Sequence, residues 1–177
     1  EPPHFKATIL SYWQACDRVS HRLLRLLAQI MGVDQHSFLS LFESPLTNMT
    51  LLHYPSMPAK PTEEAGYGIH PHKDTDALTL LFPDPVGGLW LRPREQDHWL
   101  EVAAESDTLI VNIGDLLELW SGGYFVSTPH KVVNQSGQER YSFPFFTVPR
   151  HDVTVAPLVT PHFSRYRPYG HRCSIEA

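Results

Sequence analysis

The first part of the chain carries apolar residues at the spacing of one long helix. Between Phe5 and Met31, hydrophobic side chains recur every three or four positions, with mostly polar side chains between them. This period places the apolar side chains on one face of an α-helix, which would pack against a core. Gly32 follows directly, and glycine often ends a helix because it takes the left-handed backbone conformation without strain. The pattern predicts a helix over 5–31 and a short second helix over about 35–42.

From Asn48 onward the pattern changes to short β-prone runs separated by proline and glycine. Many short strands at this spacing are typical of a sandwich or barrel. Within this region only Asp115–Trp120 looks helical, and Pro55–Gly66 lacks periodicity, which predicts a mobile surface loop. The expected strands are Thr50–Tyr54, Ala77–Phe82, Gly88–Leu91, Trp99–Val102, Thr108–Ile113, His130–Asn134, Tyr141–Val148 and Val153–Val155.

The composition fits one folded domain. Hydrophobic residues make up 42% and charged residues 19% of the 177 residues, which suits a buried core and is too apolar for a disordered chain. We expect a mainly β fold with flanking α-helix, divided into a helical lead-in (1–45), a sandwich or barrel core (about 46–156) and a tail (157–177). The formal net charge of −5 argues against a nucleic-acid partner, because phosphate binding needs a basic face.

Three further features bear on location. No stretch approaches the ~20 consecutive apolar residues that span a bilayer, so we expect no membrane partner. The N-terminus lacks the basic-then-apolar pattern of a secretory signal. The two cysteines, Cys16 and Cys173, lie near opposite ends of the sequence and form no disulfide framework. We therefore expect a cytoplasmic protein, and the sequence predicts no particular oligomeric state.

Eleven histidines invite a search for metal ligands. Four candidates, His70, His72, Asp74 and Asp76, alternate along one predicted strand, and alternation would put them on one face. His130 begins another predicted strand. One histidine and one carboxylate from a strand, with a distant histidine, have the composition of the facial triad of non-haem iron(II) oxygenases, which leaves coordination positions open. Either histidine of the first strand fits, and for any single histidine the alternative is a surface or hydrogen-bonded core position.

Arg140 and Ser142 form a second candidate group, because their spacing points both side chains to the same side of a strand. If the chain folds into a hairpin about Ser136, His130 lies opposite Ser142 and Val132 lies opposite Arg140. Opposed residues have Cβ atoms only ~4.5–5.5 Å apart. The metal ligand and the Arg/Ser pair would then line one cavity, where a planar guanidinium and a hydroxyl can receive a carboxylate. The alternative is an ordinary surface arginine within a strand.

The order of these motifs resembles the catalytic domain of the isopenicillin N synthase-like, 2-oxoglutarate-dependent iron(II) dioxygenases over roughly residues 48–150. The matching segments are Gly68–Asp74, Leu78–Leu81, Gly87–Leu89, Trp99–Val102, Val111–Asp115, Ser127–His130 and Glu139–Phe146. The resemblance implies a double-stranded β-helix, or jelly-roll, barrel preceded by the long helix. It also implies a longer protein with an N-terminal segment, which we expect to be absent from this chain.

Carried over by position, the resemblance implies that His72, Asp74 and His130 bind iron(II). It also implies that Arg140 and Ser142 bind the far carboxylate of 2-oxoglutarate. O2 would be the second cosubstrate. The implied reaction is the oxidation of a small organic metabolite by hydroxylation, desaturation or ring formation. Two alternatives are an iron oxidase of the same fold that uses no 2-oxoglutarate, and a catalytically dead module that binds a ligand or a partner.

The resemblance also selects between the two histidines of the first strand. In the family the ligand aspartate precedes a threonine by five positions, and Asp74 and Thr79 have that spacing. His70 and Asp76 would then be neighbours of the site or surface residues. Tyr54 fits a tyrosine that touches the cosubstrate in many relatives, and a plain core tyrosine is the alternative.

We assign structural roles to three further residues of the matching segments. Gly114 followed by Asp115, at the start of a short predicted helix, fits a helix cap. Asn112, two positions earlier, is also expected to be structural.

Overall fold

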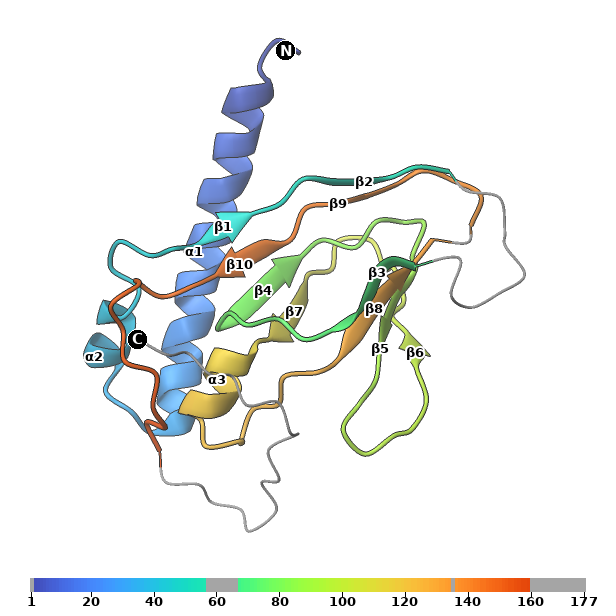
Figure 1. The fold of residues 1–177 in the computed structure, drawn as a ribbon. Helices are drawn as coiled ribbons and strands as arrows, with labels where there is room; N and C mark the ends of the chain where they lie inside the picture. Colours follow the sequence, from blue (N-terminus) through green and yellow to red (C-terminus); the bar gives the residue numbers. More distant parts are fainter. Residues whose placement is uncertain (1, 57–66, 135, 160–177) are drawn as a thin grey trace.

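The structure is a computed structural model that describes residues 2–56, 67–134 and 136–159 (Figure 1). Most of the loop predicted over Pro55–Gly66, and most of the predicted tail, lie outside the described residues. The helices are α1 (Phe5–Met31), α2 (Gln35–Ser40) and α3 (Asp115–Trp120). The strands are β1 (Asn48–Met49), β2 (Leu52–Tyr54), β3 (Tyr67–His72), β4 (Leu78–Leu81), β5 (Leu89–Leu91), β6 (Leu100–Glu101), β7 (Ile110–Ile113), β8 (His130–Val133), β9 (Arg140–Ser142) and β10 (Phe145–Thr147).

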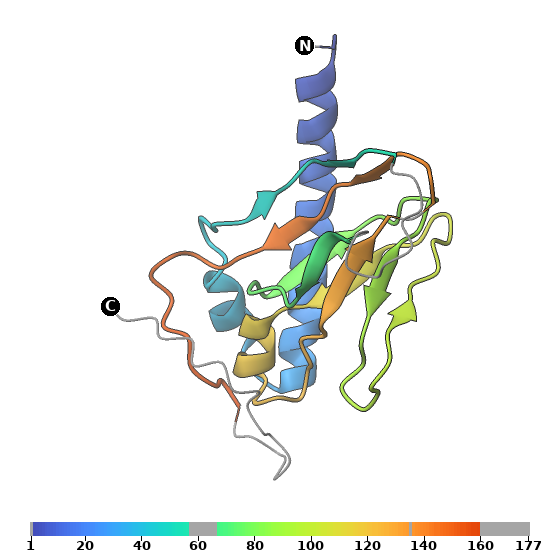
Figure 2. The ribbon, with the colours of Figure 1, turned by 45° about the vertical axis from the view of Figure 1, so that its right-hand side comes forward.

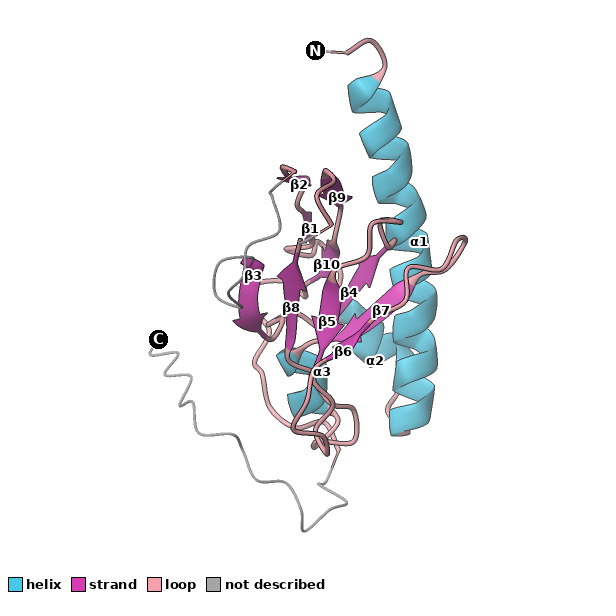
Figure 3. Ribbon diagram, turned by 90° about the vertical axis from the view of Figure 1, so that its right-hand side faces the viewer, coloured by secondary structure: helices cyan, strands magenta, loops and turns pink. Residues whose placement is uncertain are grey.

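Helix α1 has the predicted bounds and flanks the sheet that contains β4 and β10 (Figure 3). It ends at Gly32, whose φ of 70° is left-handed and whose N–H reaches the carbonyls of Ala28 and Gln29. Cys16, Leu24 and Ala28 of this helix are buried, whereas Phe5, Leu26 and Ile30 are exposed. The Trp13 ring packs edge-on against Phe145 of β10 with centroids 5.0 Å apart. The helix thus forms the outer wall of the hydrophobic core, as its periodicity predicts. Within the described part of the chain, no helix combines the length and apolarity needed to cross a membrane.

All strand pairs are antiparallel. One sheet has the order β1-β10-β4-β7, a second has the order β3-β8-β5-β6, and β2 pairs with β9. The segment from β1 to β2 runs beside the segment from β9 to β10 (Figure 2). At one end of these two segments β1 and β10 belong to the first sheet, and at the other end β2 pairs with β9. This arrangement confirms the expected mainly β, jelly-roll fold with a long flanking helix.

The predicted hairpin between the strands of His130 and Arg140 is wrong. Strand β8 has β3 on one edge and β5 on the other, so that no edge remains for β9. Strand β9 pairs instead with β2, where Arg140 lies opposite Tyr54 and Ser142 opposite Leu52. The register therefore places Arg140 beside Tyr54, the other candidate cosubstrate residue, across the β2–β9 pair.

The alternation predicted along residues 70–76 is also wrong. Strand β3 ends at His72 and contains two register shifts relative to β8, one on either side of Ile69. These shifts interrupt the regular alternation, and the side chain of His70 is exposed. Asp74 and Asp76 lie in the bend that leads into β4, where both side chains are buried.

Other strand boundaries differ from the prediction for local reasons. The run predicted over Tyr141–Val148 divides into β9 and β10 at Pro144, a residue that has no N–H for a strand ladder. The strand predicted over Val153–Val155 does not form: this segment is irregular chain, and Val153 and Val155 pack against the core.

Candidate metal centre

The side chains of His72, Asp74 and His130 converge where β3 and β8 meet. In the ladder, His72 lies directly opposite His130. One ligand atom from each of the three residues lies within 4.8 Å of the other two. Oδ1 of Asp74 is 3.7 Å from Nε2 of His72 and 3.5 Å from Nε2 of His130. A single cation can therefore contact two imidazoles and one carboxylate oxygen.

Both imidazoles are held by their other ring nitrogen. Nδ1 of His72 lies 2.8 Å from the backbone oxygen of His70, and Nδ1 of His130 lies 3.1 Å from the backbone oxygen of Thr128. A carbonyl only accepts, so each Nδ1 must carry the proton that it donates. In the neutral form of each ring, Nε2 then keeps the lone pair that can bind a metal.

The two oxygens of Asp74 have different surroundings. Oδ2 accepts hydrogen bonds from Oγ1 of Thr79 at 2.6 Å and from Nδ2 of Asn112 at 2.7 Å, while Oδ1 faces the two histidines. Burial alone would raise the pKa of Asp74, but its hydrogen bonds, above all with His130 and Thr79, outweigh burial and hold the pKa at about 2. The carboxylate is thus charged at neutral pH and fixed in orientation, as a cation ligand should be.

The neighbouring charges also act on His130 and Asp76. Burial would lower the pKa of His130, but the hydrogen bond and negative charge of Asp74 raise it. Burial, followed by the charge of Asp74, raises the pKa of Asp76 to about 7. Oδ2 of Asp76 lies 2.9 Å from Oγ1 of Thr79, whose single proton is donated to Asp74, so a protonated Asp76 can donate to this hydroxyl oxygen. Asp76 therefore lies beside the metal cluster without belonging to it, as we expected.

Helix α3 begins close to the segment of Asp74 and Asp76, and only a glycine fits at position 114. A Cβ on Gly114 would overlap the backbone and carboxylate of Asp76. Gly114 is the N-cap of α3 and Asp115 is its first helical residue, so the predicted cap lies where expected, but the Asp115 side chain does not cap the helix. The backbone N–H of Asp115 instead donates to the carbonyl of Asp74 at 2.8 Å. The start of α3 therefore fixes the backbone of a candidate ligand.

Arg140 and Tyr54 form a second polar group within the fold. Arg140 is only 1% exposed, and its Nε donates to the carbonyl of Gly87 at 2.7 Å. Its guanidinium carbon lies 4.9 Å from the centroid of the Tyr54 ring. Nη1 of Arg140 and the Tyr54 hydroxyl are buried without a hydrogen-bond partner among the described residues. Ser142 is buried as well and projects from the same face of β9 as Arg140.

Buried polar atoms normally have partners, so these two unpaired groups indicate a place for a ligand. The guanidinium charge and the hydroxyl favour an anionic one. Burial raises the pKa of the Tyr54 hydroxyl despite the charge of Arg140, so the hydroxyl keeps its proton and can donate to a carboxylate.

Sequence reasoning missed the contact of Asn112 with the site. Thr79 of β4 lies opposite Asn112 of β7, and both side chains reach Asp74. Each of these polar residues stands between apolar neighbours in a strand that packs on the core. A buried polar residue needs a partner, and this pattern was the available signal.

Comparisons with known proteins agree with this geometry. The model of the 2OG-Fe(II) oxygenase superfamily matches residues 46–149. The chain is 36% identical over 142 residues to the 2-oxoglutarate-Fe(II) type oxidoreductase hxnY of Emericella nidulans, covering 80% of this chain and 41% of that protein. It is 33% identical over 157 residues to a bifunctional coumaroyl CoA and feruloyl CoA ortho-hydroxylase of Ipomoea batatas, covering 89% of this chain and 43% of that one.

Solved structures show the same likeness. JOX2 in complex with 2OG, Fe and JA matches with a TM-score of 0.81 and 32% identity, over 92% of this chain and 48% of that chain. A full-length Neurospora crassa protein in complex with alpha-KG and thymine matches with a TM-score of 0.77 and 29% identity, over 85% of this chain and 47% of that one. The chain spans about half or less of the length of these relatives. Because the family model covers more than half of the sequence, the chain belongs to the 2OG-Fe(II) oxygenase superfamily.

Proposed function

We propose that this chain is the catalytic domain of an iron(II)- and 2-oxoglutarate-dependent oxygenase that oxidises a small organic molecule. The observation that carries the proposal is the convergence of His72, Asp74 and His130 in a member of this superfamily. Two neutral imidazoles and one carboxylate are the donor set of non-haem iron(II) oxygenases. Among the described residues, no further histidine, cysteine or acid joins this cluster. Iron(II) held there would supply the activation of O2.

The residues of the chain have separable roles in this proposal. Asp74 contributes the negative charge, and its hydrogen bonds from Thr79 and Asn112 leave one oxygen for the ion. The backbone carbonyls behind His72 and His130 hold the proton of each neutral ring on Nδ1, so that Nε2 is the nitrogen that faces the ion. These contacts orient the ligands before the metal arrives, which reduces the ordering cost of binding.

Arg140 would bind the far carboxylate of 2-oxoglutarate, with Tyr54 and Ser142 beside it. The proposal rests on the unpartnered Nη1 of Arg140 and the unpartnered hydroxyl of Tyr54 among the described residues. A planar guanidinium suits a carboxylate because it can donate two parallel hydrogen bonds. Its burial excludes water, which would otherwise weaken this charge pair.

The substrate class is proposed by analogy with the relatives. Their names include a hydroxylase of coumaroyl CoA and feruloyl CoA, and the Neurospora crassa structure contains thymine. We therefore propose a small organic substrate for this chain as well. The cytoplasmic location and the lack of nucleic-acid or membrane partners stay predictions.

The test is a screen of candidate metabolites for substrate-stimulated formation of succinate from 2-oxoglutarate, in the presence of iron(II) and O2. The proposal predicts succinate formation that requires iron and is lost in Asp74→Ala. O2 uptake that continues without 2-oxoglutarate would favour the iron oxidase instead. Binding of iron and 2-oxoglutarate with no turnover of any candidate, even in a form as long as the relatives, would favour the binding module.

A further inference from the structure

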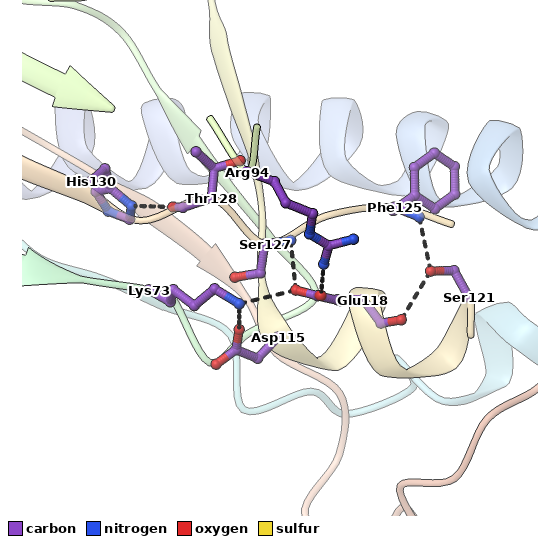
Figure 4. Close-up of polar contacts among 9 residues, drawn as sticks. All are labelled: Lys73, Arg94, Asp115, Glu118, Ser121, Phe125, Ser127, Thr128 and His130. Atoms are coloured by element: carbon purple, nitrogen blue, oxygen red, sulfur yellow. Dashed lines mark hydrogen bonds and ion pairs between the residues drawn. The ribbon is translucent and has the colours of Figure 1, made fainter. Parts of the chain in front are cut away.

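Glu118 of α3 is a buried acid outside the candidate ligand set, and it lies at the meeting point of three chain segments (Figure 4). Its Oε2 accepts from Nζ of Lys73 at 3.1 Å and from the backbone N–H of Ser127 at 2.8 Å. Its Oε1 accepts from Nη2 of Arg94. One carboxylate thus receives hydrogen bonds from two cations and one backbone amide.

Two of these partners belong to the segments that carry the candidate ligands. Lys73 stands between His72 and Asp74 in the sequence. Ser127 is followed by Thr128, whose carbonyl holds Nδ1 of His130. Glu118 therefore connects, through one side chain, the segment that carries two ligands and the segment that carries the third.

The third partner adds the loop after β5. Arg94 lies in this loop, and the backbone N–H of Arg92 donates to the carbonyl of Pro129 at 2.9 Å. Pro129 immediately precedes His130 in the sequence. The loop is thus tied both to Glu118 and to the residue before the third ligand.

The backbone of α3 supports this connection from the same helix. Ser121 donates from Oγ to the carbonyl of Glu118 at 3.0 Å, and the N–H of Phe125 donates to that Oγ at 3.1 Å. These bonds secure the turn that leads from α3 toward Ser127. Such a buried carboxylate is favourable only while its donors stay in place, since losing one leaves a buried charge without compensation.

We propose that Glu118 is a positioning residue of the metal centre: by binding Lys73 and Ser127 it sets the separation between the His72/Asp74 segment and His130. The proposal rests on the function proposed above. Glu118 acts through its partners and touches neither ion nor substrate. Groups bonded directly to metal ligands typically contribute about 10- to 100-fold to metal affinity. Glu118 acts through residues next to the ligands, so its contribution should lie at or below the lower end of that range.

The test uses Co(II) as a metal probe of the full chain, because its visible absorption reports ligand geometry without turnover. Glu118→Gln keeps the shape of the side chain and removes its charge. We expect Co(II) to bind more weakly, by up to about tenfold, with altered absorption bands at saturation. Unchanged affinity and unchanged bands in the folded variant would overturn the proposal.

Lys73→Met provides a second variant in case Glu118→Gln does not fold, since Lys73 is partly exposed. It should change Co(II) affinity and bands in the same direction, to a smaller extent. In a folded double variant, the combined loss should be smaller than the sum of the two single losses, because both substitutions remove the Lys73–Glu118 contact. If Lys73→Met leaves affinity and bands unchanged, the proposal is overturned whether or not Glu118→Gln folds.

Asp84→Asn is the matched structural control. The Asp84 carboxylate accepts the backbone N–H groups of Val86 and Tyr141, each at 2.8 Å, in a loop that carries no candidate ligand. The Asp84→Asn substitution should lower the melting temperature without changing the Co(II) affinity or the absorption bands. If instead it changes both as Glu118→Gln does, general loosening of the fold explains the effect and the positioning role is wrong. If the unmodified chain binds no Co(II), or if His130→Ala binds it equally well, the metal centre itself fails.

Discussion

Arg140 and Tyr54 lie directly opposite each other in the β2–β9 ladder, with the guanidinium carbon of Arg140 4.9 Å from the centroid of the Tyr54 ring. The contact holds the guanidinium over the ring, a favourable geometry for a cation and an aromatic side chain. The hydrogen bond from Nε of Arg140 to the carbonyl of Gly87 also holds the guanidinium in place. Nη1 and the tyrosine hydroxyl are the groups that this arrangement leaves for a ligand.

Arg140→Lys should weaken 2-oxoglutarate binding far more than metal binding. Lysine keeps the charge but loses the two-pronged geometry. The loss of one hydrogen bond to a charged group is of order 1.5–3 kcal/mol, roughly tenfold to over a hundredfold in affinity. Calorimetric titration of the metal-loaded chain with 2-oxoglutarate measures this affinity, with the surface substitution Arg150→Lys as control. Equal affinities in Arg140→Lys and the unmodified chain would contradict the assignment of the carboxylate site.

Tyr54→Phe separates a cosubstrate contact from a plain core position. The variant keeps the ring beneath Arg140 and removes only the buried hydroxyl. If the hydroxyl donates to 2-oxoglutarate, affinity should fall by about 0.5–1.5 kcal/mol, roughly two- to tenfold. The same titration measures this loss. An unchanged affinity together with a raised melting temperature would identify Tyr54 as a core residue.

His72→Ala, Asp74→Ala and His130→Ala should each abolish stoichiometric binding of iron(II). Removing one of three ligands leaves too few to hold a labile divalent ion. His70→Ala serves as the matched control, because His70 is exposed and lies outside the ligand cluster, so it should bind one ion per chain. Metal analysis after anaerobic dialysis gives the stoichiometry. Loss of iron in His70→Ala with retention in His72→Ala would reverse the assignment of the two histidines.

Asp76 should give the metal-free chain a characteristic pH dependence. Its folded pKa of about 7 lies above the usual value near 4, so between these values the folded state holds a proton that the unfolded state has lost. Stability contributed by Asp76 therefore decreases as pH rises through this window, by at most about 1.4 kcal/mol per pH unit. Asp76→Asn should reduce this slope. Urea unfolding at several pH values between 4.5 and 6.5 measures how the free energy of unfolding changes with pH.

The control for this experiment is Asp152→Asn, which replaces an exposed carboxylate paired with Arg150. It should keep the slope of the unmodified chain. If Asp76→Asn shows the same pH slope as the unmodified chain, Asp76 does not hold the proton, and the conclusion that burial raises its pKa is wrong.

The long helix and the identities of the candidate ligands could be predicted because each depends on a local pattern. Residues 5–31 carry a helical period, and the run from His72 to Asp74 belongs to a motif with a recognisable order. The structure brings these two residues together with His130, as the resemblance implied.

The partners of these residues depend on contacts that no local pattern encodes. The hairpin about Ser136 was the simplest pairing for neighbouring strands, yet β8 already has two partners and β9 crosses to β2. The register shifts beside Ile69 likewise disrupt the alternation that assigned His70 and His72 to one face. Glu118 gave no signal beyond an acid in a short helix, because its partners come from three distant segments.

The most direct test of the account is to measure iron and 2-oxoglutarate on the same chain by anaerobic equilibrium dialysis. The account predicts one iron(II) and one 2-oxoglutarate per chain. Both should be lost in Asp74→Ala, in which the metal cluster is incomplete. A chain that binds iron(II) stoichiometrically and retains no 2-oxoglutarate, or that retains it equally in Asp74→Ala, would contradict the central claim.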